Sequence, residues 1–220
     1  MTSGPTWAEL EAAANTTPKK IRFELQQLLY AGAKYGKFVE LVERAIDYSS
    51  RKMVAAKNIL NDNMTEDQLT YALSAPLLGM GFDISHSTNQ GGHCDIVVEG
   101  DYEMLWLGEA KKYTGYGKLM GGHQQLVDRY ASGLAEQLNG GMIIYMFGAQ
   151  AATMTAEWRK YLEDTRDGLR SETIENQPLQ FRSIETHRAT EQDLTVRHFV
   201  IPLFHKPTDP EPPPARKKAA

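Results

Sequence analysis

Two short stretches decide the fold that this sequence predicts: Gly92-His93-Cys94-Asp95-Ile96-Val97-Val98 and, fourteen positions after the aspartate, Glu109-Ala110-Lys111. Residues two apart in a strand point to the same face, so the glutamate and the lysine of the second stretch emerge together. If the turn between the strands is centred on Tyr102, Asp95 lies directly opposite Glu109. Two carboxylates and an amine then meet on an apolar sheet, where unpaired charges are costly. Such a cluster indicates a metal ion or chemistry that uses it.

Composition bounds the class of protein. With 220 residues and 41% hydrophobic content, the chain can bury one sizeable core. Cys94 is the single cysteine, which excludes disulfides within the chain and any multi-cysteine zinc site. The sequence shows no charged-then-apolar leader and no apolar run of membrane-spanning length, so it predicts a soluble, cytoplasmic protein without a membrane partner.

Charge is distributed unevenly along the chain. The net charge of −4 argues against a protein that coats nucleic acid by bulk electrostatics. Between Lys19 and Leu60, however, there are nine basic and four acidic residues. The net charge of this segment is therefore +5, and that of the rest of the chain is −9. This basic segment favours polyanion binding or an interface between copies of the chain, and it is equally typical of solvated helix faces.

The pattern predicts two helices between residues 19 and 60, separated near Gly32 and Gly36. Thr65 and Gln68 form a capping-box pair that starts another helix, which Pro76 is expected to kink or end. After a glycine-rich loop over 115–122, further helices are expected over 123–138 and 155–169. The strand predictions, in chain order, are 82–87, 93–98, 104–111, 142–147, 179–185 and 196–202.

These elements predict an α/β fold, a mixed sheet with helices on both faces. The core order is helix, strand, strand, strand, helix, strand. We expect three regions: an N-terminal helical arm (1–61), an α/β core (62–206) and a disordered, proline-rich basic tail (207–220).

Residues 65–147 resemble the PD-(D/E)XK nuclease superfamily, which has the restriction-endonuclease-like fold. The resemblance is carried by Glu66 at the start of a helix, Asp95 in the second strand and Glu109-Ala110-Lys111 in the third. It implies a metal-dependent endonuclease that hydrolyses DNA, with RNA the less expected substrate. Restriction enzymes, repair nucleases and effectors of antiphage defence are the roles that a small nuclease of this kind resembles.

By this resemblance Asp95 and Glu109, with the carbonyl of Ala110, would hold Mg²⁺ or Mn²⁺. Hard cations prefer such oxygen ligands and make water nucleophilic. Glu66 would complete or support the metal site, with Asp67 as its rival. Lys111 would orient the attacking water or help to lower its pKa.

Simpler interpretations exist for each of these side chains. Asp95 and Glu109 could be ordinary strand-end carboxylates in a salt bridge with Lys111. Glu66 could serve only the helix dipole, as acidic residues in a first turn commonly do.

The candidate nucleic-acid contacts surround the third strand and the helix after it: Lys112, Lys118, Gln124, Gln125 and Arg129. Lys112 alternates with Lys111 and is expected to point to the opposite face, as a solvated neighbour. Some superfamily members place a glutamine four residues before a tyrosine here. Gln124 and Gln125 precede Tyr130 by six and five, so that spacing is not matched.

His86, His93 and Cys94 invite a zinc interpretation, but structural zinc takes four strong ligands with short pair spacings, which these lack. We expect Cys94 to be a small buried residue.

Two alternatives to a nuclease remain open. The chain could bind nucleic acid on a nuclease-like fold without cutting it. It could also be an interaction module in which residues 19–60 assemble a homo-oligomer while the core senses a ligand.

Overall fold

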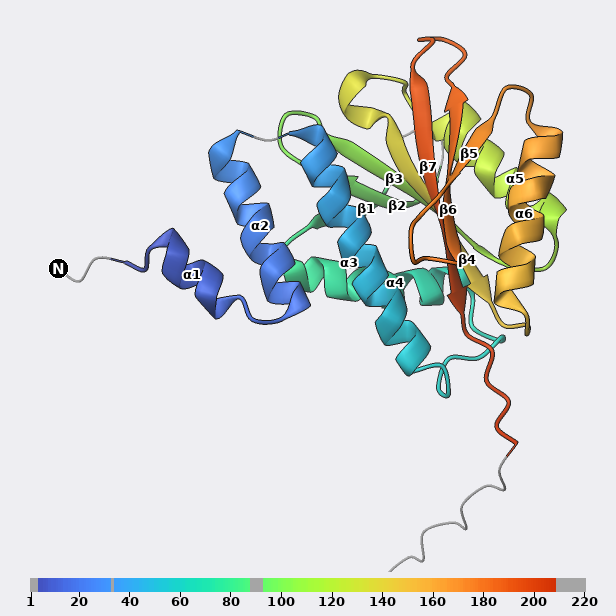
Figure 1. Cartoon of the computed structure of the whole chain (residues 1–220), viewed down its shortest axis with the longest axis horizontal. Helices are drawn as coiled ribbons and strands as arrows, with labels where there is room; N and C mark the ends of the chain where they lie inside the picture. Colours follow the sequence, from blue (N-terminus) through green and yellow to red (C-terminus); the bar gives the residue numbers. More distant parts are fainter. Residues whose placement is uncertain (1–3, 33, 88–92, 209–220) are drawn as a thin grey trace, which may run out of the picture.

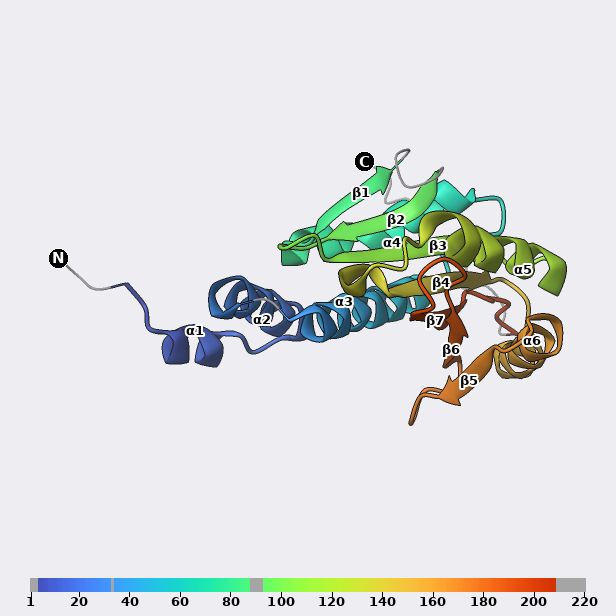
Figure 2. The ribbon, with the colours of Figure 1, turned by 90° about the horizontal axis from the view of Figure 1, so that it is seen from above.

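The computed structural model describes residues 4–32, 34–87 and 93–208. Within them, strands form one mixed sheet in the order β1-β2-β3-β4-β7-β6-β5, with helices on both faces (Figures 1 and 2). The predicted α/β architecture is confirmed. The strands are β1 (Asp83–Ser87), β2 (Cys94–Glu99), β3 (Leu105–Lys112), β4 (Asn139–Met146), β5 (Arg170–Thr173), β6 (Gln180–Thr186) and β7 (Asp193–Pro202).

The helices are α1 (Trp7–Ala13), α2 (Thr17–Ala31), α3 (Tyr35–Ala55), α4 (Glu66–Met80), α5 (Tyr116–Gln124) and α6 (Ala151–Thr165). A π-helical segment η1 (Gln125–Tyr130) continues α5, and a short 3₁₀ helix η2 (Ala135–Gln137) precedes β4. The capping box of Thr65 and Gln68 at the start of α4 is present as predicted.

Strand pairing places the predicted meander at one side of the sheet. β1, β2 and β3 pair antiparallel in sequence order. β4 then lies parallel to both β3 and β7, and β6 and β5 complete the other side in antiparallel pairing. The carboxyl ends of β3 and β4 therefore lie at one edge, where the candidate residues of β3 are found.

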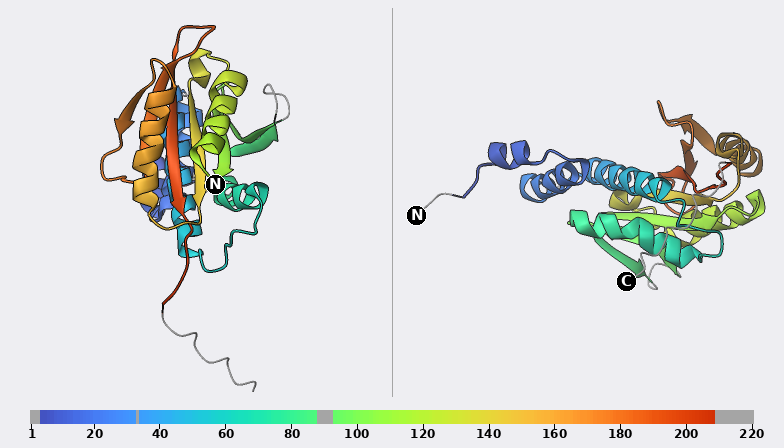
Figure 3. Two further views of the ribbon diagram at one scale, coloured as in Figure 1. Left: turned by 90° about the vertical axis from the view of Figure 1, so that its right-hand side faces the viewer. Right: turned by 90° about the horizontal axis from the view of Figure 1, so that it is seen from below.

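Two hydrophobic clusters cover the two faces of the sheet. α2, α3 and α4 pack on one face against side chains such as Trp106 and Tyr145, and α5, η1 and α6 pack on the other against Leu107 and Ile144. Figure 3 shows α5 and α6 together on one side of the strands, with the N-terminal helices behind them. Because both faces are covered, the central strands β3 and β4 are buried along nearly their whole length.

The N-terminal helices are part of this core. Phe38 and Leu41 of α3 belong to the same cluster as α4 and the sheet, so the predicted boundary at residue 61 does not coincide with a break in packing. Two basic side chains of the segment over 19–60 are paired within the chain. Lys37 and Arg44 both contact Glu24, at 2.9 and 2.7 Å. This segment also lies on the face of the sheet opposite α5.

α3 is joined to the last strands by buried charges. Glu43, 2% exposed, accepts hydrogen bonds from Arg182 and from Arg197, the latter at 3.0 Å. Arg197, 6% exposed, also reaches Asp47 at 2.8 Å. These pairs satisfy one another, which makes the removal of a single partner expensive.

The helix that starts after Thr65 does not end at Pro76, one of the two outcomes expected there. α4 continues through Pro76 to Met80, because a proline costs one backbone hydrogen bond while Leu73 and Leu77 remain anchored in the core. The glycine-rich segment expected as a loop is helical: α5 begins at Tyr116, and η1 ends at Tyr130 instead of continuing to residue 138.

Smaller differences concern element ends and short elements. α6 begins four residues before the predicted helix at 155 and ends at Thr165. α1 and β5 were not predicted, since neither carries a buried apolar pattern: α1 buries no residue and β5 reads Arg-Ser-Glu-Thr. Most of the predicted tail, from residue 209 on, lies outside the described residues. Among the described helices, none combines the length and the apolar character that crossing a membrane requires.

The buried charges under α3 lead to a stability prediction. We expect Arg197→Met to lower the free energy of unfolding by about 3 kcal/mol, because Glu43 and Asp47 keep their buried charges with one partner fewer. Arg170→Met, which breaks an exposed pair with Asp193, is the control and should cost less than about 1 kcal/mol. Urea denaturation measures both, and equal losses for the two variants would contradict the prediction.

Candidate functional site

The register of β2 and β3 is the one the sequence predicted. Val97 pairs with Leu107 and Val98 with Trp106, so the connection is centred on Tyr102. Tyr102 has a φ of 58°, a left-handed conformation that lets the chain reverse over a few residues. The same register continued past the last paired residues sets Asp95 opposite Glu109.

Beyond the last paired residues, the side chain of Asp95 joins β2 to β3 by a hydrogen bond. Its Oδ2 accepts a hydrogen bond from the backbone N–H of Ala110 at 2.8 Å and lies 3.8 Å from the Lys111 ammonium. Burial raises the pKa of Asp95, and the Ala110 N–H and Lys111 oppose that rise. The carboxylate is therefore fixed in direction by backbone on the neighbouring strand.

Glu109 and Lys111 emerge from the same face of β3 and contact each other. The Lys111 ammonium donates to Glu109 Oε1, so that lysine lies within reach of both strand carboxylates. Glu109 is 1% exposed, and its Oε2 is buried without a hydrogen-bond partner among the described residues. Burial, followed by the charge of Asp95, raises the pKa of Glu109 to about 7.

Glu66 joins the start of α4 to the end of β3. Its Oε1 accepts the backbone N–H of Lys112 at 2.7 Å and the Lys118 ammonium at 2.5 Å. Burial opposes ionisation of Glu66, but these donors outweigh it and lower the pKa of the carboxyl. Glu66 thus has a structural role that its helix position alone did not indicate. Asp67, the rival, is exposed.

A depression of about 750 Å³ adjoins Lys111. Its lining includes four of the five predicted nucleic-acid contacts, Lys118, Gln124, Gln125 and Arg129. Gly121, Gly122 and Asp128 complete the lining. We call this depression the Lys111 groove. It brings Lys111 of the candidate centre and two further basic side chains, Lys118 and Arg129, to one open surface.

Lys112 lies elsewhere. Its ammonium contacts Asp62 Oδ1 at 2.9 Å and the Met64 carbonyl at 3.2 Å, and it lies over the ring of Phe147. As predicted, it points away from Lys111, but it is not a solvated neighbour: its side chain is 19% exposed. Its contacts tether the segment before α4, and its role in binding nucleic acid stays a prediction.

The donor chemistry of the cluster fits a hard divalent cation. Such ions prefer the oxygen types that are present here: the carboxylates of Asp95 and Glu109 and the carbonyl of Ala110. Glu109 Oε2 accepts no hydrogen bond from the described residues, so it is available as a ligand. No group of three or more His, Cys, Asp or Glu side chains among the described residues is arranged for a metal as it stands. Glu66 is engaged with Lys112 and Lys118, so the two strand carboxylates are the principal candidates.

The structure also bears on the zinc interpretation. Cys94 is 2% exposed, and its Sγ donates to the carbonyls of Ile96 and Gly108, each at 3.4 Å. The prediction of a small buried residue is confirmed. His93 is exposed, and the side chain of His86 lies outside the described part.

Sequence reasoning missed the role of Gly122. A Cβ there would lie 2.9 Å from Met142 Cε and 3.0 Å from Lys111 Cγ, whereas a Cβ on Gly121 would meet nothing within 4 Å. Gly122 therefore lets α5 approach β3 closely enough to confine the stem of Lys111. Two adjacent glycines in a segment otherwise able to form a helix were the available signal.

Comparisons with protein-family models, with curated proteins and with solved structures find no match to this chain. The geometry of the Asp95, Glu109 and Lys111 cluster therefore carries the functional argument.

The adjacent glycines provide a matched pair of variants. Gly121→Ala should raise the free energy of unfolding by about 0.5–1 kcal/mol, because alanine is the better helix former. Gly122→Ala should lose that gain, because its methyl group must displace Met142 and Lys111. Thermal or urea unfolding compares them, and equal stabilisation by both changes would refute the close packing inferred for Gly122.

Glu109 gives a pH prediction. Its pKa is raised from 4.5 to about 7, so between these values the folded protein binds a proton that the unfolded chain releases. Its contribution to stability is therefore present below about pH 4.5 and is lost as pH rises through about 7. Glu109→Gln should match the parent near pH 4 and be more stable than it at pH 8. Urea unfolding in EDTA across this range checks the difference, and parallel curves would contradict it.

Proposed function

We propose that this protein is a metal-dependent nuclease that hydrolyses phosphodiester bonds of DNA, and that the region from α4 to β4 is a PD-(D/E)XK-type core. The observation that carries the proposal is the meeting of Asp95, Glu109 and Lys111 on paired strands beside a groove with basic side chains. The order of α4, three strands, α5 and β4 supports the same assignment.

In this proposal Asp95, Glu109 and the Ala110 carbonyl hold Mg²⁺, for which Mn²⁺ substitutes. The cation, when bound, supplies Lewis-acid stabilisation of charge on the phosphate and a more acidic water. The unpartnered Glu109 Oε2 and the fixed direction of Asp95 favour these two carboxylates as its ligands.

Lys111 has a separate task. Its ammonium lies between groups of opposite charge, which outweigh the effect of burial and raise its pKa, so it remains a cation. A cation confined by Gly122 beside the groove can donate a hydrogen bond to an attacking water or to a phosphate oxygen. Substrate binding replaces part of its interaction with Glu109 in this scheme.

The groove binds the polyanion through charge. Arg129 and Lys118 line it with Lys111, and Gln124 and Gln125 add neutral donors. Contacts of this kind bind the phosphate backbone and give affinity that falls with salt.

One cleavage assay tests the proposal. Purified protein is incubated with plasmid, linear and single-stranded DNA and with RNA, in Mg²⁺, Mn²⁺ or EDTA. We expect cleavage of DNA only with the cations, and a loss of at least about 10³-fold in Asp95→Asn and Lys111→Ala, because each removes a group at the centre of charge stabilisation.

Two variants of the same chemical type serve as controls. Asp101→Asn changes an exposed aspartate in the turn before β3, and Lys160→Ala changes an exposed lysine of α6. Both should cleave as the parent does. Cleavage by Asp95→Asn at the parent's rate, or in EDTA, would refute the proposal. DNA binding without cleavage in any cation would identify a binding module instead.

A further inference from the structure

The helix that borders the Lys111 groove ends in an unusual conformation. In η1 the N–H of Ala131 donates to the carbonyl of Leu126, five residues earlier, at 3.0 Å. Such π-helical turns are rare and are less well packed than an α-helix, so they persist where side chains hold them. η1 carries Gln125 and Arg129, two of the side chains that line the groove.

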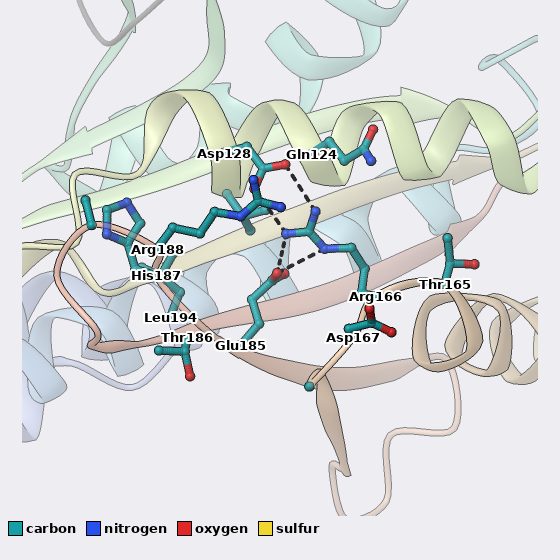
Figure 4. A pocket seen from close by; sticks show the side chains of 13 residues that line it. Gln124, Asp128, Thr165, Arg166, Asp167, Glu185, Thr186, His187, Arg188 and Leu194 are labelled. Carbon is teal, nitrogen blue, oxygen red and sulfur yellow. Dashed lines mark hydrogen bonds and ion pairs between the residues drawn. The ribbon is translucent and has the colours of Figure 1, made fainter.

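Arg166, which follows α6, holds this turn from outside the groove. Its guanidinium donates to both carboxylate oxygens of Asp128, each at 3.1 Å, and to Glu185 Oε2 through Nε at 3.0 Å (Figure 4). The planar fork matches two carboxylates at once, which a lysine could not do. Arg166 lines the neighbouring cavity of about 720 Å³ and not the groove itself.

Glu185 extends the contact to the preceding turn. Its Oε1 lies 2.6 Å from Nε2 of His123, a fully buried residue of α5 whose ring stacks on that of His198. At the far end of η1, the hydroxyl of Tyr130 donates to the carbonyl of His93, just before β2, at 2.7 Å. The segment that presents Gln125 and Arg129 is thus fixed before η1 at His123, within it at Asp128 and at its last residue, Tyr130.

Asp128 gives Arg166 a second effect. This carboxylate lines the groove, where its side chain is 37% exposed, and it would repel a phosphate backbone. Arg166 pairs with it from the opposite side. The pairing removes most of the repulsion without placing another side chain in the path of the substrate.

We propose that Arg166 is a positioning residue for polyanion binding: it holds η1 in place and neutralises Asp128, so that Arg129 and Gln125 face the substrate beside Lys111. This inference rests on the proposed function for its substrate, but the positioning of η1 can be tested without one.

The main variant is Arg166→Met, which keeps the length of the side chain and removes the guanidinium. Its matched control is Arg170→Met, whose exposed pair with Asp193 lies at the start of β5. Hydrogen–deuterium exchange should speed up over residues 125–130 in Arg166→Met and stay at the parent's rate in Arg170→Met. Unchanged exchange over 125–130 in a folded Arg166→Met protein overturns the proposal.

Binding of a fluorescent DNA duplex in EDTA is the second measurement. We expect Arg166→Met to raise the dissociation constant about tenfold and Arg170→Met to leave it within about twofold. Adding Asp128→Asn to Arg166→Met should recover part of the loss, since the exposed carboxylate is then neutral. In cleavage, KM should rise while kcat stays near that of the parent. A fall in kcat alone would show that Arg166 does not act through binding and would overturn the proposal.

The same measurements also test the proposal if Arg166→Met does not fold or if the parent does not bind DNA. If Arg166→Met does not fold, Arg166→Lys keeps the charge without the fork and should show the faster exchange over 125–130; parent-like exchange would refute the proposal. If the parent binds no DNA, the proposed function fails, and the exchange comparison alone decides whether Arg166 positions η1.

Discussion

The pairing of β2 with β3 is the constraint on which the candidate site depends. Side chains alternate between the two faces of a sheet, so a slip of one residue would send Asp95 to the face opposite Glu109 and Lys111. The turn centred on Tyr102 and the hydrogen bond from the Ala110 N–H to Asp95 both maintain this register. Strong burial of the flanking residues, Val97 and Val98 among them, makes the alternative pairing costly.

A buried carboxylate beside another carboxylate is unstable unless cations are near. At this site the cation is the Lys111 ammonium, and the close approach of α5 at Gly122 confines it. The raised pKa of Glu109 shows that the lysine compensates burial and the charge of Asp95 only in part. The same residual cost that destabilises the folded protein at high pH favours the binding of a divalent ion, so stability and the proposed activity are linked through one side chain.

Alternation and turn chemistry were enough to predict the meander, its register and the meeting of Asp95, Glu109 and Lys111. These features are encoded locally, between Asp83 at the start of β1 and Lys112 at the end of β3. The role of Gly122 in α5 was missed because it depends on close packing against Lys111 and Met142, which no local propensity records. The contact of Arg166 with Asp128 spans 38 positions, and neither residue stands in a recognisable motif. Short polar β5 pairs antiparallel with β6 and carries no apolar pattern that the sequence could reveal.

The buried charges beneath α3 have a consequence for how the chain can be made. Glu43 finds its partner Arg197 only across 154 positions of sequence. During synthesis, α3 leaves the ribosome long before β6 and β7 exist, and its two inward-facing carboxylates stay hydrated until those strands arrive. Completion of this ion-pair network must therefore wait for nearly the whole polypeptide. In a nascent chain that stops before β7, Glu43 and Asp47 lack the Arg197 guanidinium.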